Sequence, residues 1–219
     1  MRQNVVMILA SGSPRRKELL SQAGLEFEVI VSEIEEVQHK TKPDEVVLDL
    51  SYQKCDAVAQ SFIKNPPENL STLIDLQRGG IMVIGADTVV SLDEKILGKP
   101  ENGKTALKML MELSGKSHKV YTGVTCKVLK FSSYQDILIE TDSFSFCVET
   151  LVNMYKFDEY EAIDYISSGE PMDKAGAYGI QGLGQRLVES ISGDYNNVVG
   201  FPLSRFVKEL SEREYIEYI

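Results

Sequence analysis

An apolar run that leads straight into a turn and a helix start opens this chain and indicates its fold class. Residues 5–10 are apolar, and the turn residues Ser11, Gly12, Ser13 and Pro14 follow them. A short apolar run bounded by turn residues predicts a buried strand. Ser13 is a favoured N-cap and Pro14 a favoured first helical residue, so a helix is predicted over residues 14–23. A strand that feeds a helix in this way indicates an α/β fold.

Two arginines occupy the first turn of that helix, where the helix dipole disfavours cations. They are Arg15 and Arg16. The free backbone N–H groups at the helix start attract anions, and guanidinium groups beside them suit a phosphate. Together with Ser11 and Ser13 the turn therefore predicts a phosphate cradle. A solvated face of an ordinary amphipathic helix is the alternative.

The rest of the chain alternates helices and strands and contains one hairpin. Strands are expected at residues 27–31, 81–92, 119–131, 136–149 and 186–191. Helices are expected at residues 44–63, 104–113, 158–167 and after Pro202. The hairpin turn at residues 132–135 makes the sheet mixed rather than purely parallel. The pattern shows neither a repeat nor a linker. Residues 1–219 are therefore expected to form a single domain, with 65–80 as a polar surface insertion.

The composition excludes several classes of protein. The chain has 219 residues, of which 43% are hydrophobic, enough for a sizeable core. Its net charge of −10 argues against binding a nucleic-acid polymer, so a phosphate ligand must be small and held by a local basic cluster. Three scattered cysteines and two separated histidines favour neither a disulfide framework nor a histidine metal site, and they predict a reducing compartment. No apolar segment is long enough for a signal peptide or a membrane span, so a cytoplasmic protein is expected.

Asp87 is the strongest candidate for chemistry. It lies within an apolar strand, where a carboxylate costs several kcal/mol unless it is paired or binds a metal. Gly85, two residues earlier, leaves room for a close backbone approach. A structural aspartate that holds a turn is the alternative. Glu33, Glu35 and Glu36 follow the second strand and could ligate Mg²⁺ or Mn²⁺, although such an acidic run is also typical of a solvated face.

Two further segments carry residues suited to a nucleotide. Lys99 precedes a proline that stiffens its turn. The segment 173–185 is rich in glycine, whose backbone permits a close approach to a flat ligand. Within it Lys174 can reach a phosphate, Tyr178 can stack, and Gln181 offers a base edge both a donor and an acceptor. Its glycines match neither standard nucleotide fingerprint, and a flexible loop is the alternative.

Four motifs follow one another along nearly the whole chain. They are SGSPRR at 11–16, GADT at 85–88, LGKP at 97–100 and MDKAGAYGIQG at 172–182. Together they resemble the Maf family of nucleotide pyrophosphatases. The resemblance implies an elongated mixed sheet flanked by helices, with a central cleft between two lobes, similar to inosine-triphosphate pyrophosphatases. It also implies hydrolysis of a nucleoside triphosphate to the monophosphate and pyrophosphate with a divalent cation, Mg²⁺, Mn²⁺ or Co²⁺.

The resemblance also implies roles for individual residues. Asp87 matches the catalytic base, Glu35 its partner in holding the metal, and Lys54 and Lys99 the catalytic lysines that hold phosphates. Around Lys54 the chain reads SYQKC and lacks the alanines that usually flank the family's lysine. Three residues match the specificity positions of the subgroup that acts on dTTP and UTP: Arg15, Thr88 and Gln181. The other cations and the turn hydroxyls are expected to bind substrate: Arg16, Lys174, Ser11 and Ser13.

Two functions from different classes follow. The first is a pyrophosphatase that acts on dTTP, UTP or modified pyrimidine nucleotides. The second is a nucleotide-binding regulator of cell division and septum formation without significant turnover. An acidic pair, Glu35 and Asp87, beside a basic cluster favours the enzyme, because a pure binding protein has no need of it. Two-fold dimers are the commonest assembly, so a homodimer is expected.

Overall fold

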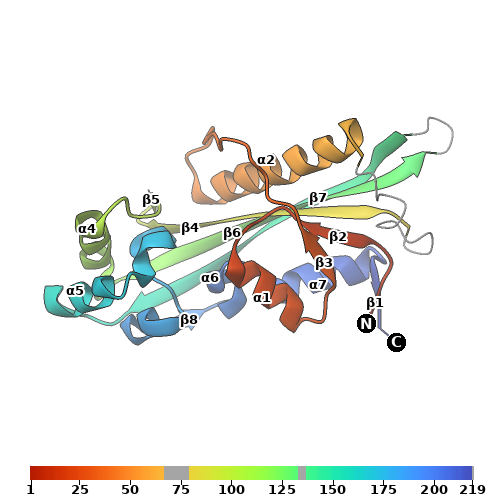
Figure 1. The fold of residues 1–219 in the computed structure, drawn as a ribbon. Coiled ribbons are helices and arrows are strands. Elements are labelled where there is room, and N and C mark those ends of the chain that lie inside the picture. Colours follow the sequence, from red (N-terminus) through yellow and green to blue (C-terminus); the bar gives the residue numbers. More distant parts are fainter. Residues whose placement is uncertain (67–78, 133–136, 219) are drawn as a thin grey trace.

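The computed structural model describes residues 1–66, 79–132 and 137–218 and shows one long sheet with helices on both faces (Figure 1). Within these ranges the sheet has seven strands, in the order β3-β2-β4-β6-β7-β8 with β5 paired to β4. They are β2 (Val6–Leu9), β3 (Phe27–Val29), β4 (Ile81–Leu92), β5 (Lys95–Leu97), β6 (Ser117–Ser132), β7 (Ile137–Met154) and β8 (Val188–Ser192). A separate small sheet pairs β1 (Arg2–Gln3) with β9 (Ile216–Glu217).

The sheet is mixed, which confirms the prediction from the hairpin. β2 runs parallel to β3 and to β4, whereas the pairs β4–β5, β4–β6, β6–β7 and β7–β8 are antiparallel. β6 and β7 are the long arms of the predicted hairpin. Residues 133–136 of its turn lie outside the described residues, as do residues 67–78 of the predicted insertion.

Helices cover both faces and one end of the sheet (Figure 1). The long helix α2 (Pro43–Lys64) lies along one face. The opposite face carries α1 (Pro14–Gln22), α6 (Tyr195–Val199) and α7 (Leu203–Glu212). At one end of the sheet, α4 (Gly103–Leu113) and α5 (Glu159–Ser167) pack together around a shared apolar cluster. None of the described helices is long and apolar enough to cross a membrane.

The alternation of side chains along β4 decides which face each functional residue points to. Met82 and Ile84 pack in the apolar cluster that includes Phe206 of α7. Ile81 and Val83 instead pack in a cluster with residues of α2. Because successive side chains of a strand point to opposite faces, Asp87 points towards α2 and Thr88 away from it. Neighbouring residues of one motif thus reach different helices.

Two glycines let the backbone of α2 lie directly on the sheet. A Cβ added at Gly85 of β4 would collide with the carbonyl oxygen of Ser51 and come within 2.8 Å of Cys55. A Cβ added at Gly123 of β6 would collide with the carbonyl oxygen of Val47. The sequence-based expectation of a close backbone approach at Gly85 is therefore confirmed. Only glycine at these strand positions permits the helix to come this near.

Several short elements differ from the sequence-based expectations. β1, β5, α6 and β9 were not predicted, because two to five residues carry too little periodicity to be recognised. β7 continues to Met154, beyond the predicted end at residue 149. The glycine-rich segment forms three 3₁₀ helices rather than an open loop. They are η1 (Glu170–Asp173), η2 (Ala175–Ala177) and η3 (Gly182–Leu187).

Candidate active site

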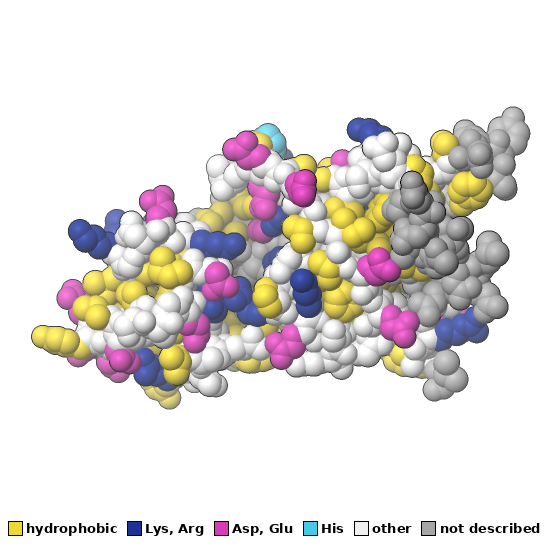
Figure 2. Space-filling model, viewed as in Figure 1, with side chains coloured by type: hydrophobic (Ala, Val, Ile, Leu, Met, Phe, Trp, Pro, Cys, Tyr) yellow, Lys and Arg dark blue, Asp and Glu magenta, His cyan; other side chains and the backbone are white. Residues whose placement is uncertain are grey.

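A cleft of about 470 Å³ opens beside the middle of β4. β2 pairs with β4 only as far as Ile84, and β5 pairs with it only from Val90. Among the described residues no strand covers this edge of β4 between those two points. Its walls come from the start of α1, from α2, from the segment of η1 to η3 and from residues 198–200. Figure 2 shows acidic and basic side chains intermixed around the hollow. A cleft of this volume suits a small-molecule ligand.

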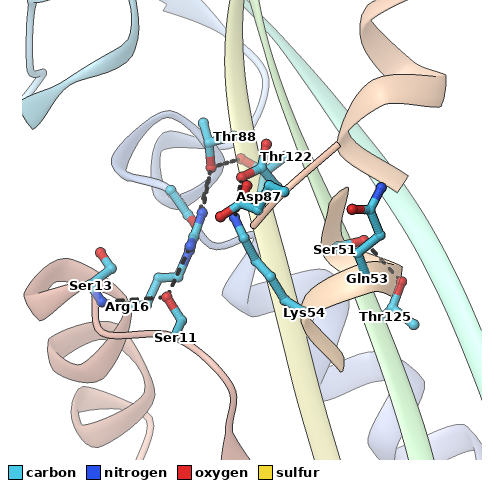
Figure 3. A network of polar contacts seen from close by, with 12 residues as sticks. Ser11, Ser13, Arg16, Ser51, Gln53, Lys54, Asp87, Thr88, Thr122 and Thr125 are labelled. Atoms are coloured by element: carbon cyan, nitrogen blue, oxygen red, sulfur yellow. Dashed lines mark hydrogen bonds and ion pairs between the residues drawn. The ribbon is translucent and has the colours of Figure 1, made fainter. Parts of the chain in front are cut away.

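Lys54 joins two carboxylates inside the cleft. Its Nζ lies 2.6 Å from Asp87 Oδ1 and 3.1 Å from Glu36 Oε2. The side chains of Lys54 and Asp87 are each only 14% exposed, so water screens this pair weakly. Figure 3 shows the lysine extending from α2 to the aspartate on β4. The close packing of α2 on Gly85 is what brings the ammonium to this carboxylate.

Arg16 is buried and holds three parts of the chain together. Its Nε donates to the carbonyl oxygen of Gly200 at 2.9 Å, its Nη1 to Ser11 Oγ at 3.0 Å, and its Nη2 to Thr88 Oγ1 at 3.1 Å. Burial lowers the pKa of the Arg16 guanidinium from its ordinary value. Arg16, rather than the specificity candidate Arg15, is the arginine that contacts Thr88 in the structure. Two of the five guanidinium N–H groups remain for a ligand.

The remaining cations line the same cleft, and they differ in whether they form ion pairs with carboxylates. Arg15 Nη1 lies 3.0 Å from Asp173 Oδ2. Lys174 Nζ donates to Asp173 Oδ1 at 2.8 Å and to the carbonyl oxygen of Glu170. Burial raises the pKa of Asp173, but hydrogen bonds from Lys174 and Arg15 outweigh it and hold that pKa below its usual value. Lys99 makes no ion pair with any described residue and is exposed, so its ammonium is available to a ligand.

The segment that carries Gln181 is fixed from both sides by one buried tyrosine and one carboxylate. Tyr165 Oη accepts from the N–H of Gly179 at 3.2 Å and donates to Glu170 Oε1 at 3.1 Å. The Glu170 carboxylate also accepts from the N–H groups of Leu183 and Gly184, at 2.9 and 3.3 Å. Gln181 lies between these anchors and lines the cleft. The ordered hydrogen bonds favour the binding role over the alternative of a flexible loop.

Three residues lie differently from the expectation. Ser13 is the N-cap of α1 by position, but its side chain accepts no capping hydrogen bond. Ser11 lies in an adjoining hollow rather than in the main cleft. Glu35 is exposed and lines neither hollow, whereas its neighbour Glu36 reaches Lys54. Which glutamate of an acidic run points inward depends on the path of an irregular segment, and no periodic pattern predicts that path.

Sequence reasoning overlooked one wall of the cleft. Val198, Val199 and Gly200 line it, at the end of the short helix α6. Gly200 has a φ of 125° and follows the apolar pair, so the glycine was the available signal for a special turn. Its carbonyl oxygen is the one that accepts from Arg16.

The site fits a hard divalent cation. Asp87 and Glu36 contact the same ammonium, so their oxygens are no further apart than the sum of those two distances. Carboxylate oxygens are the ligands that Mg²⁺ prefers, and Mg²⁺ is often held by one or two of them together with substrate phosphates. Nowhere in the described part of the chain do three or more His, Cys, Asp or Glu side chains form a metal cluster. A cation here would therefore depend on the substrate for further ligands.

Comparison with known proteins agrees with this geometry. The family model described as Maf-like protein matches residues 6–213. The dTTP/UTP pyrophosphatase of Agathobacter rectalis is 48% identical over 204 residues, which cover 93% of this chain and 95% of that protein. The dTTP/UTP pyrophosphatases of Bacillus thuringiensis subsp. konkukian and Bacillus cereus are 45% and 46% identical over 207 residues, with 94% of each chain covered. The family match over most of the chain and these full-length similarities lead to one conclusion: the chain belongs to the Maf-like protein family.

Proposed function

We propose that this protein is a pyrophosphatase that hydrolyses dTTP and UTP to the monophosphate and pyrophosphate with the help of a divalent cation. The observation that carries the proposal is a paired carboxylate, Asp87, at the centre of a cleft lined by five cations. These cations are Arg15, Arg16, Lys54, Lys99 and Lys174. A triphosphate brings several negative charges, which such a cluster can hold although the whole chain is acidic. The names of the curated relatives support the choice of substrate.

Asp87 is proposed as the base that takes the proton of the attacking water. Lys54 fixes the direction of this carboxylate through the 2.6 Å contact. Asp87 and Glu36, with Glu35 as the adjacent alternative, would hold the divalent cation, which supplies Lewis-acid activation of water and phosphate when bound. Lys99, Arg15 and Lys174 would bind the phosphate oxygens. Positioning and charge stabilisation then provide most of the rate enhancement, as in other phosphoryl chemistry.

The pyrimidine preference is assigned to the three specificity positions that the resemblance implies, Arg15, Thr88 and Gln181, with Arg16 holding Thr88 in place. Gln181 offers one donor and one acceptor, which match the O4 and N3–H edge of uracil and thymine. The anchors on both sides of Gln181 hold this residue at the wall of the cleft. A base with the opposite pattern would leave polar groups unpaired and would be rejected.

The deciding experiment is product analysis with a panel of nucleoside triphosphates, with and without Mg²⁺, Mn²⁺ or Co²⁺. We expect pyrophosphate and the monophosphate from UTP and dTTP, and little product after chelation. Asp87→Asn keeps the shape of the side chain but cannot accept the proton, so turnover should fall on the order of 100-fold or more while the fold remains. Orthophosphate and diphosphate as products would refute the reaction. Tight nucleotide binding without turnover would instead support the regulator of cell division.

The cellular location and the oligomeric state of the enzyme are part of the same proposal. Cys55, Cys126 and Cys147 are all free thiols, which supports a reducing, cytoplasmic location. A two-fold homodimer is proposed on the general frequency of such assemblies. Sedimentation equilibrium would test it, and a single species with the mass of one chain would contradict it.

A further inference from the structure

A line of hydroxyl groups runs from Thr88, beside Arg16 at the wall of the cleft, into the buried interior of the protein. Thr88 Oγ1 lies 3.0 Å from Thr122 Oγ1 on the neighbouring strand β6, as Figure 3 shows. Thr122 Oγ1 in turn lies 3.0 Å from the carbonyl oxygen of Asn197 in α6. Asn197 is anchored by its side-chain Nδ2, which donates to Val120 O and to Thr150 Oγ1, both at 3.0 Å. Four segments distant in the sequence therefore meet along one line.

The chemistry of the two ends fixes the direction of every proton in this line. Arg16 can only donate, and the carbonyl oxygen of Asn197 can only accept. Thr122 has one hydroxyl proton, and it must give this proton to Asn197 for that 3.0 Å bond to exist. Thr88 must then donate to Thr122, while it accepts from Arg16. Each hydroxyl thus accepts one hydrogen bond and donates one, and all point the same way.

The other acceptor near Thr88 agrees with this direction. The carbonyl oxygen of Gly200 lies 3.4 Å from Thr88 Oγ1, further than Thr122 does. That carbonyl already accepts from Arg16 Nε at 2.9 Å. Because Thr88 donates its proton to Thr122, the carbonyl oxygen of Gly200 accepts from Arg16 without competition from Thr88.

Thr122 and Asn197 are both fully buried, and neither lines the cleft. We propose that Thr122 is a positioning residue for the nucleotide site, which acts by orienting the Thr88 hydroxyl and thereby the guanidinium of Arg16, with Asn197 as its fixed support. A second consequence is that Thr88 meets a ligand only as an acceptor and selects an N–H or O–H donor there. The link to catalysis rests on the proposed function, whereas the orientation of Arg16 does not.

The test compares Thr122→Val, which keeps the shape but removes the hydroxyl, with Thr122→Ser, which keeps the hydroxyl. In Thr122→Val the Thr88 proton has lost its acceptor and turns to Gly200 O, where it competes with Arg16 Nε. We therefore expect the Nε–H of Arg16 to exchange with water faster in the nucleotide-free protein, measured by NMR on ¹⁵N-labelled arginine. The kcat/KM for UTP should fall roughly 3- to 10-fold, as expected for one lost hydrogen bond. Thr122→Ser should stay within about twofold of the parent on both measurements.

Thr125→Val is the matched control, because Thr125 is also a buried threonine of β6. Its hydroxyl lies 2.9 Å from Ser51 Oγ and from Ser145 Oγ, with no contact to the arginine. The Arg16 signal should not change in this variant. Thr122→Ala supplies a second hydroxyl-free variant if Thr122→Val does not fold.

Two results would overturn the proposal. One is an unchanged Arg16 exchange rate in the folded hydroxyl-free variants. The other is a Thr122→Ser protein as impaired as Thr122→Val, since shape rather than the hydroxyl would then matter. If the parent protein does not turn over UTP at all, the proposed function fails, but the NMR comparison still decides whether the hydroxyl line orients Arg16.

Discussion

Gly85→Ala tests whether the close packing of α2 on β4 is what assembles the proposed catalytic pair, Lys54 and Asp87. Gly85 has no left-handed backbone angle, so alanine is acceptable to the strand itself. The added methyl group would meet the helix instead. It would collide with the carbonyl oxygen of Ser51 and lie 2.8 Å from the N and Cβ atoms of Cys55. These are rigid parts of the helix, so no side chain can rotate away.

The size of the effect follows from these distances. An ordinary Cβ contact begins near 3.4 Å, so the helix must move away from the strand by about 0.6 Å to relieve the Cys55 contacts alone. The collision with Ser51 requires more. Overpacking of this kind costs about 1–3 kcal/mol of stability. Lys54 lies one turn beyond Ser51 on the same helix, so the same movement separates its Nζ from Asp87 Oδ1, now 2.6 Å apart. A displacement of about 1 Å near a reacting centre can lower the rate about 100-fold.

The assay pairs urea unfolding with kcat for pyrophosphate release from UTP. Gly103→Ala is the control, because a Cβ there meets only Ile166 Cγ2 at 3.7 Å and Gly103 lies at the start of α4, away from the cleft. That variant should keep its activity and lose no stability. A Gly85→Ala protein with parental stability and kcat would show that α2 does not pack directly on this glycine. It would also refute the idea that this packing positions Lys54.

Three further outcomes are expected. Gln181→Ala should lower kcat/KM for UTP by roughly 1–3 kcal/mol but change that for GTP far less; an equal loss for both would make Gln181 structural. Burial raises the pKa of Glu170, but hydrogen bonds from two backbone N–H groups and Tyr165 outweigh it, so the pKa lies below its usual 4.5. Its stabilisation is therefore lost as pH falls below about 4.5, and Glu170→Gln should unfold at lower urea at pH 7 with a weaker loss in acid. Burial lowers the pKa of His118 from 6.5 to about 4, so only the unfolded chain binds that proton between these values. In the parent protein this proton uptake lowers the unfolding free energy by up to about 1.4 kcal/mol for each pH unit from 6.5 down to about 4. His118→Phe should lack this loss, which urea unfolding at pH 7 and pH 5 would measure.

The longer elements were predictable because each repeats a simple pattern. The apolar residues of α2 recur at helical spacing, and β4 is an almost continuous apolar run. The mixed sheet followed from one hairpin. β5 and α6 are too short for such a pattern, and their places are set by pairing with β4 and by packing on the sheet.

The sequence could predict which kinds of residue belong to the candidate site, but not which side chains or carbonyl groups they contact. Asp87 stood out because a carboxylate is costly in an apolar strand, and the structure shows how Lys54 offsets that cost. Nothing local in the sequence distinguishes Lys54 from other helix lysines, because its role depends on where α2 packs on the sheet. The same holds for Arg16 and Arg15, which are neighbours in the chain but end at Gly200 and Asp173, more than 150 residues away.

The alternation along β4 also restricts how this protein can change in evolution. Asp87 faces Lys54 on one side of the sheet, and Thr88 faces Arg16 on the other. Each of the two side chains therefore serves a different face of the sheet. An insertion or deletion of one residue earlier in the strand would turn both side chains to the wrong face at once. This part of the strand can therefore accept exchanges of residue type but not of length.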